Sequence, residues 1–186
     1  MSFSEIKAAQ VAAFFAFKAD GSINVLKLMK LMYLSERKSY EEFGEPIIGD
    51  HLVSMDQGPV LSKTFNCFNG AGSEDVWGKW ISAKSGYQLG LVPTIKDPSK
   101  QLELLSRAEL NVLDSIWQQF GPMDQWALVA YTHDHCDEWE DPHGSSAGIP
   151  LERLLKALKF NHDDRSALIA RVDEHSAVDR ILAAAR

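Results

Sequence analysis

The most informative part of the sequence reads Lys27-Leu28-Met29-Lys30-Leu31-Met32-Tyr33 and lies within a helical pattern that ends near Glu42. Its apolar side chains recur every three or four residues on two overlapping stripes, so a wide face of the helix is apolar. The other side carries the basic side chains, namely Lys27, Lys30, Arg37 and Lys38. Because so wide an apolar face must be covered from more than one side, the pattern predicts the buried central helix of the fold.

A second helix precedes this stretch. Ser2 and Glu5 have the spacing of a capping box, and apolar residues then recur at helical intervals, at Ala8, Val11, Ala12 and Phe15. Asp20-Gly21 ends this helix, because glycine tolerates the left-handed conformation that terminates one. Either Ser22 or Asn24 then caps the central helix.

Short strands are expected after the central helix. Residues 51–55 alternate between apolar and polar as a strand does, and Gln57-Gly58-Pro59 ends this strand. Pro59 lacks an N–H, which suits the first turn of a helix over residues 60–68. Residues 80–83 and 87–91 predict two further strands around a turn at residues 84–86.

The remaining sequence is mainly helical. Ser106 and Glu109 form a capping box for a helix to Phe120, and Asp124 caps the next. Helical patterns also cover residues 151–158 and run from Asp163 or Asp164 to the C-terminus. The expected fold is therefore α+β and predominantly α-helical: a helical bundle around a central buried helix, with a small antiparallel sheet of two or three strands.

Size and composition indicate one globular domain over residues 1–186. The chain has 186 residues, of which 45% are hydrophobic, and none of its apolar runs reaches the roughly 18 residues that span a bilayer. No basic start followed by an apolar segment marks a signal peptide. The two cysteines, Cys67 and Cys136, form no CxxC pair and fit a reducing compartment. We expect a cytoplasmic protein with no membrane partner.

Charge narrows the class of partner. The formal net charge is −7, and the acidic excess is concentrated in a segment that carries Asp134, Asp137, Glu138, Glu140 and Asp141. Nucleic-acid binding calls for a basic face, so no direct nucleic-acid partner is expected. A segment of this kind is either a solvated acidic loop or an attractive surface for a basic protein.

The strongest metal candidates are His133, His135, Cys136 and His143, which have the side-chain types that bind zinc. On a helix, however, His133 and Cys136 share a face while His135 points away. A metal-dependent hydrolase that uses the region from His133 to His143 remains a hypothesis, but we expect no cofactor. Cys67 is interpreted as a small core residue, and the carboxylates of Asp137 and Glu138 as solvated.

Three further features have an interpretation in terms of packing. The Gly58-Pro59 corner is a backbone device that orients the strand against the next element. Tyr33 lies on a buried helix, where its hydroxyl needs a hydrogen-bond partner. Trp126 and Trp139 are core residues or, at an exposed rim, anchors for a partner.

The order of these motifs resembles the Panacea domain, also called the SocA-like antitoxin domain, a family also described as phage-associated. The resemblance covers about residues 5–160 and leaves a C-terminal helical extension at 161–186. It rests on the motifs Lys27-Leu28-Met29-Lys30-Leu31-Met32-Tyr33, Gln57-Gly58-Pro59-Val60, Leu105–Gly121 and Thr132-His133 followed by Trp139. The chain departs from the family pattern at Met55-Asp56-Gln57, where the family has an aromatic and a basic residue, and at Glu138, where it tends to have proline.

The resemblance implies a bacterial or prophage antitoxin that neutralises a cognate protein toxin by direct contact and has no catalytic centre. The candidate partner-binding residues are Tyr33, Gln57, Gly58, Pro59, His133, Asp137, Glu138, Trp139 and Asp141. The acidic segment favours a basic toxin. An adaptor that delivers the bound toxin to a protease needs the same kind of surface and stays open, as do the toxin's identity and the oligomeric state.

Overall fold

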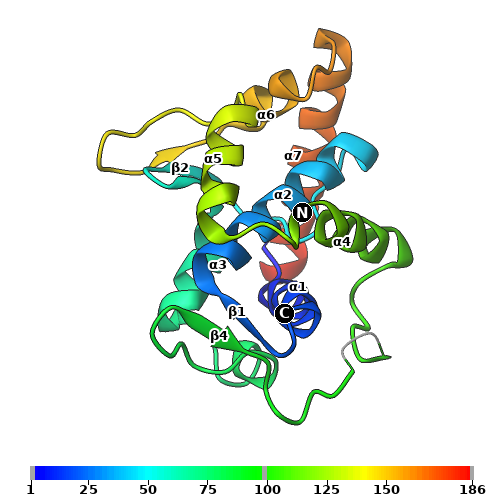
Figure 1. Ribbon diagram of the computed structural model, residues 1–186. Coiled ribbons are helices and arrows are strands. Elements are labelled where there is room, and N and C mark those ends of the chain that lie inside the picture. The colour runs from blue at the N-terminus through cyan, green and yellow to red at the C-terminus, as the bar shows by residue number, and fades with distance from the viewer. Residues whose placement is uncertain (1–2, 98–99, 185–186) are drawn as a thin grey trace.

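Helix α2 (Val25–Phe43) is the centre of the fold in the computed structural model, which describes residues 3–97 and 100–184. It packs against helices α1 (Glu5–Lys18), α4 (Arg107–Phe120) and α5 (Gln125–His135) (Figure 1). Leu28, Leu31 and Met32 on α2 are fully buried. The predicted central helix and the predominantly helical α+β class are therefore confirmed.

Local side-chain caps define the helix ends. The Asn24 side chain accepts hydrogen bonds from the backbone N–H groups of Leu26 and Lys27, which makes Asn24 the N-cap of α2. The predicted capping box at Ser106 and the predicted cap at Asp124 are both present, at the starts of α4 and α5. Ser4 caps α1, whereas the predicted cap Ser2 lies outside the described residues.

Two small antiparallel sheets lie beside the helices. In one, β1 (Ser22–Asn24) pairs with β4 (Gln88–Gly90). In the other, β2 (Leu52–Met55) lies between β3 (Gly58–Leu61) and β5 (Ala147–Gly148). The β2–β3 pair is a hairpin in which Met55 faces Gly58, so Asp56 and Gln57 form its turn. This hairpin lies against α2 and α5.

Two predictions about the strands are wrong. Pro59 does not begin a helix, because Gly58–Leu61 is strand β3 and helix α3 covers only Ser62–Asn66, followed by a π-helical turn at Cys67–Ala71. A short, fully buried strand has no alternation that distinguishes it from a helix start. Residues 80–83 follow a 3-10 turn at Trp77–Lys79 and contribute a single bridge, from Ile81 to Leu91, in place of a strand.

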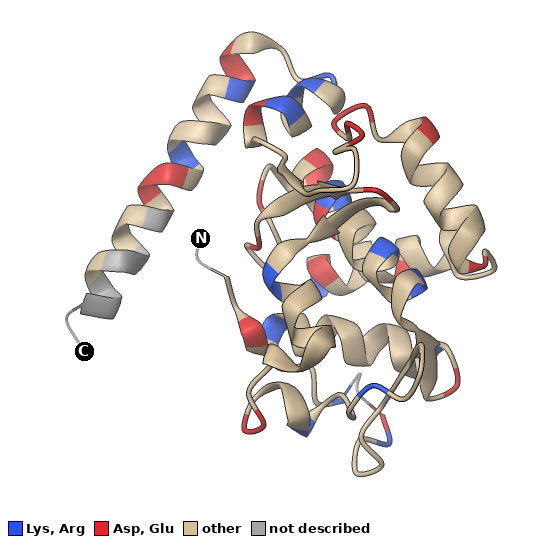
Figure 2. Ribbon diagram, turned by 90° about the vertical axis from the view of Figure 1, so that its left-hand side faces the viewer, with Lys and Arg blue, Asp and Glu red and all other residues tan. Residues whose placement is uncertain are grey.

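The C-terminal part consists of α6 (Leu151–Ala157) and α7 (His162–Ala184), in agreement with the helices predicted there. Arg171 of α7 donates hydrogen bonds to the carbonyl oxygens of Phe43 and Gly44, where α2 ends. Beyond this contact α7 extends away from the other helices (Figure 2), and Val178 and Ile181 on it are exposed. Within residues 3–97 and 100–184, no helix combines the length and apolar character needed to cross a membrane.

A buried carboxylate fixes the loop that joins α2 to the hairpin. The side chain of Glu36 accepts hydrogen bonds from the backbone N–H groups of Ile47, Ile48 and Gly49. Burial raises the pKa of Glu36 to about 7, although these three N–H groups favour the ionised form. The loop therefore starts β2 from a fixed position relative to α2.

Candidate functional site

Most of the predicted site residues meet where α2, the β2–β3 hairpin and the C-terminal end of α5 come together. We call this region the α2–α5 junction; it comprises Lys30, Tyr33, Arg37, Gly58, Pro59, His133, Cys136, Glu138 and Trp139. Gln57 lies beside it, exposed in the hairpin turn. Asp137 and Asp141 are exposed, and their carboxylates lie beside Lys159 and His143, outside the junction.

Glu138 is the polar centre of the junction. Its side chain has 0% exposure, and its Oε1 accepts hydrogen bonds from the Tyr33 hydroxyl at 2.7 Å and from Arg37 Nε at 2.8 Å. The expectation of a solvated carboxylate is therefore wrong at this residue. The backbone makes a turn that contains Glu138, closed by the hydrogen bond from the Trp139 N–H to the Cys136 carbonyl, and Glu138 points inward from it. Tyr33 has the partner that its buried hydroxyl required.

Three ionisable groups of the junction, Tyr33, Arg37 and Cys136, have one protonation state at neutral pH. Burial, reinforced by Glu138, raises the pKa of Tyr33 well above its ordinary value and that of the Cys136 thiol to about 12. Burial by itself lowers the pKa of Arg37, but the attraction of Glu138 outweighs it and the net direction is upward. The tyrosine and thiol therefore stay protonated and the guanidinium stays charged, so Cys136 is no activated nucleophile.

Lys30 lies inside the protein, although the sequence pattern placed it on the polar side of α2. Its side chain is covered by β3, has 0% exposure, and donates a hydrogen bond from Nζ to the Pro59 carbonyl at 2.9 Å. Among the described residues, no acidic side chain lies within ion-pair distance of Nζ. Burial therefore lowers the pKa of Lys30 to about 7, against a small upward influence of Cys136.

Gly58 is required for this close approach. Its φ of 93° lies in the left-handed region, and a Cβ there would come within 2.8 Å of Lys30 Nζ and 2.7 Å of Thr132 Oγ1. The Gly58-Pro59 corner is thus a packing device, as predicted, but one that belongs to a hairpin.

Two stacked rings attach the segment after α5 to the hairpin. The rings of His133 and Trp139 are 4.0 Å apart at an angle of 14°, and Trp139 Nε1 donates a hydrogen bond to the Met55 carbonyl at 3.0 Å. Burial and the nearby Lys30 lower the pKa of His133, so its ring is neutral at neutral pH. In the described part of the chain, His133 Nε2 is buried without a hydrogen-bond partner.

The proposed metal ligands are not brought together. The ring of His135 stacks on Tyr131 at 4.3 Å, that of His133 stacks on Trp139, and His143 is exposed beside Asp141. Over the described ranges, no group of three His, Cys, Asp or Glu side chains has a metal-binding arrangement. The rings of His133 and His135 thus form packing contacts.

The acidic segment uses most of its charges within the molecule. Asp137 pairs with Lys159 at 3.1 Å, Glu140 pairs with Arg153, and Asp141 accepts a hydrogen bond from the backbone N–H of His143. Only Asp134 has no ion-pair partner among the residues that the structure describes. The exposed charge of this segment is smaller than its composition indicates.

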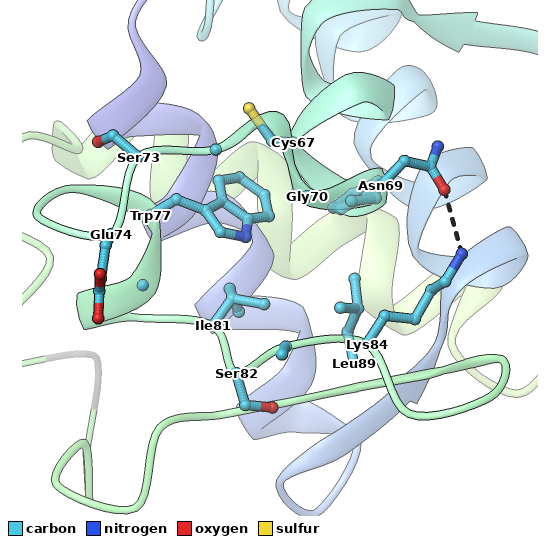
Figure 3. Close-up of a pocket in the computed structure, with 14 residues that line it drawn as sticks. Cys67, Asn69, Gly70, Ser73, Glu74, Trp77, Ile81, Ser82, Lys84 and Leu89 are labelled. Atoms are coloured by element: carbon cyan, nitrogen blue, oxygen red, sulfur yellow. Dashed lines mark hydrogen bonds between the residues drawn. The ribbon is translucent and has the colours of Figure 1, made fainter.

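The hollows on the surface are not apparent from the sequence. Two adjoining cavities of about 330 and 450 Å³ share the side chains of Leu26, Met29, Gln57 and Phe65, and we call them together the α2 groove. A third cavity, of about 560 Å³, is shown in Figure 3, where Trp77, Ile81 and Leu89 lie along its inner side. The apolar pattern of α2 marked Leu26 and Met29 for burial, and only the tertiary arrangement shows that they face a hollow.

Replacement of Glu138 by glutamine tests the junction. Glu138→Gln removes the charge that neutralises Arg37 in a buried site, so we expect the free energy of unfolding to fall by about 3 kcal/mol. Asp137→Asn is the matched control, because its ion pair with Lys159 is exposed and contributes at most about 0.5 kcal/mol. Urea denaturation at pH 7 measures both. Equal effects of the two substitutions would contradict the buried role of Glu138.

Lys30 gives a pH-dependent prediction. Its pKa is lowered from 10.5 to about 7, so between these values the unfolded chain holds a proton that the folded chain lacks, and stability rises with pH. Lys30→Met removes this contribution. We expect the wild-type chain to gain on the order of 2 kcal/mol more than Lys30→Met between pH 7 and 9.5. Urea denaturation at both pH values measures the gain, with the exposed Lys156→Met as control. Parallel pH profiles for wild type and Lys30→Met would disprove the assignment.

Comparisons with known proteins identify the family. No curated protein and no solved structure matches the chain significantly. A family model described as "Antitoxin SocA-like, Panacea domain" matches residues 28–140, which is more than half of the chain. The match contains every residue of the α2–α5 junction, as well as β2, β3, α4 and α5. The chain therefore belongs to the family of SocA-like antitoxins with a Panacea domain.

Proposed function

We propose that the protein is the antitoxin of a toxin–antitoxin system, that it neutralises a cognate protein toxin by direct protein–protein contact, and that it catalyses no reaction itself. The observation that carries this proposal is the family match over residues 28–140. This range includes a junction whose polar groups bond to one another, which is typical of a structural framework for a binding surface.

The chemistry of the junction supports a role in binding. The hydroxyl of Tyr33 and the carboxylate of Glu138 are used in hydrogen bonds to each other, and the Cys136 thiol stays protonated. A catalytic group needs access to substrate and a pKa near the working pH. The buried Tyr33 and Cys136 meet neither requirement, and the carboxylate of Glu138, at 0% exposure, lacks the access; we assign all three to positioning.

The candidate partner-binding residues divide by exposure. Tyr33, Gly58, Pro59 and Glu138 are buried and position the surface from inside. Gln57, Asp137 and Asp141 are exposed, and His133 and Trp139 are half-buried. The exposed and half-buried residues are the ones that can contact a toxin directly, over the roughly 1,600 Å² that a specific interface buries.

Charge guides the proposed encounter. The formal net charge of −7 attracts a basic toxin over distances longer than any single contact and disfavours nucleic acid as a direct partner. Within the acidic segment, Asp134, Asp137, Glu140 and Asp141 are exposed and contribute to this attraction.

Co-expression tests the function. We expect co-expression of this chain with the product of the adjacent reading frame to restore growth that this product inhibits, and the two proteins to co-purify. Rescue that persists in a host without ATP-dependent proteases indicates masking of the toxin, whereas rescue that needs a protease indicates delivery to it. A toxic neighbour that neither binds the chain nor is neutralised by it would refute the proposal.

Charge reversal tests the encounter. Asp134→Lys, Asp137→Lys and Asp141→Lys together are expected to slow association with the toxin by about tenfold at low salt, with little effect at high salt. Glu138 is left intact because its loss would unfold the junction. The control reverses Asp163, Asp173 and Glu174 on α7, which gives the same change in net charge elsewhere. Equal association rates for the two triple variants in stopped-flow mixing would show that the acidic segment has no special part.

A further inference from the structure

We propose that the α2 groove receives an extended segment of the partner protein, and that this segment carries one carboxylate flanked by apolar side chains. This inference rests on the proposed function, because it names the surface and the chemistry through which the toxin is held. Of the partner-binding residues expected from the sequence, Gln57 and Gly58 line the groove, whereas the acidic segment lies outside its lining.

The groove combines an apolar interior with exposed aromatic rings at one end. Its interior is formed by Leu26 and Met29 of α2 and by Phe65 of α3. Trp126, at 58% exposure, and Tyr87, at 81%, line the outer end. Large aromatic side chains left exposed beside an apolar hollow are the residue types that dominate binding energy in protein interfaces.

The shape of the groove favours an extended chain. It runs from the β2–β3 turn and residues 144–145, past Phe65, to Tyr87 and Trp126. Amide side chains occur along it, at Asn24, Gln57, Asn69 and Gln125. In an extended segment alternate side chains point to one side while backbone groups stay free to bond, which matches an elongated apolar hollow edged by amides.

The positive charge in the groove favours a carboxylate on the inserted partner segment. Lys84 is exposed on its wall and donates a hydrogen bond to Asn69 Oδ1 at 3.1 Å, and Lys30 lies at its floor. Neither lysine has an ion-pair partner among the described residues. The carboxylate of Asp56, also in the lining, already accepts a hydrogen bond from the Gly144 N–H at 2.9 Å. Lys84 thus places an exposed positive charge in the groove of a chain whose net charge is −7.

The positive charge of Lys84 on an otherwise acidic protein indicates the chemistry of the partner segment. A basic protein is attracted by the surface as a whole, while the segment that enters the groove needs a negative group opposite Lys84. Asn69 and Lys84 line both the groove and the third cavity, and Figure 3 shows the hydrogen bond between them at the third cavity, so we place Lys84 on the ridge between the two hollows. A carboxylate at this ridge fixes the register of the inserted segment.

Binding measurements on the full chain test the inference. We expect Trp126→Ala and Lys84→Glu each to weaken the complex with the product of the adjacent reading frame by at least about tenfold. Ile181→Ala and Lys79→Glu are the matched controls, because both residues are exposed and lie outside the groove lining; these are expected to leave the Kd within about twofold. Thermal unfolding followed by circular dichroism establishes that all four variants are folded.

Peptides from the partner test the carboxylate. Overlapping peptides that cover the partner's sequence are titrated against the wild-type chain, and the peptide that binds is remade with asparagine or glutamine in place of its acidic residue. We expect the amide peptide to bind at least about tenfold more weakly to the wild-type chain. A lysine in place of the acidic residue should bind Lys84→Glu better than it binds the wild-type chain.

The outcomes separate this inference from the proposed function. If the wild-type chain forms no complex with the neighbouring product, both are overturned. If the complex forms and the groove variants bind as tightly as the controls, the groove is overturned while the antitoxin role stands. If the amide peptide binds as well as the acidic one, or if the groove instead holds a second copy of this chain in a homodimer that Trp126→Ala dissociates, the assigned occupant is wrong.

Discussion

The need to neutralise one buried carboxylate governs the arrangement of this protein. Glu138 is buried, so its charge has to be neutralised by Arg37, and the Tyr33 hydroxyl donates a further hydrogen bond to its carboxylate. Both partners are on α2, four residues apart and therefore on one face of the helix. The segment after α5 can satisfy Glu138 only by lying across α2, and this position brings the ring of Trp139 onto the hairpin.

A second buried ionisable side chain attaches the hairpin to the same helix. Lys30 reaches the Pro59 carbonyl because Gly58 leaves room for its ammonium group. The hairpin is thus held from both sides, by α2 through Lys30 and by the α5 end through Trp139. Its exposed turn, at Asp56 and Gln57, becomes a rigid wall of the α2 groove. The junction therefore supports the neighbouring α2 groove. Within the junction the polar side chains of Tyr33 and Glu138 are buried, whereas the aromatic rings of Tyr87 and Trp126 are exposed and can contact a partner.

The helices of this fold were predictable because their signals are local. Asn24, Ser106 and Asp124 cap helices through bonds to backbone groups two or three residues away, and such bonds can be recognised in the sequence. The buried charges were not predictable in the same way. Lys30 lies on the basic side of the helical pattern, and only the strand that covers it places it inside. Glu138 belongs to an acidic run, and its partner Arg37 is 101 residues away in sequence. The pairing of β1 with β4 is similarly non-local, so residues 22–24 were recognisable only as a cap.

The two cysteines are natural reporters on this arrangement. Cys136 and Cys67 are buried, and burial raises the pKa of each thiol, to about 12 and about 11, so little thiolate is available to react. Alkylation by a maleimide therefore requires a local opening that exposes the sulfur. Because Cys136 lies beside Glu138, its labelling rate records how often the segment after α5 lifts from α2. Cys67 lies directly after α3 and lines the third cavity, so its labelling rate records opening at that cavity. The labelling rates of the two native thiols thus report separately on local opening in two parts of the chain.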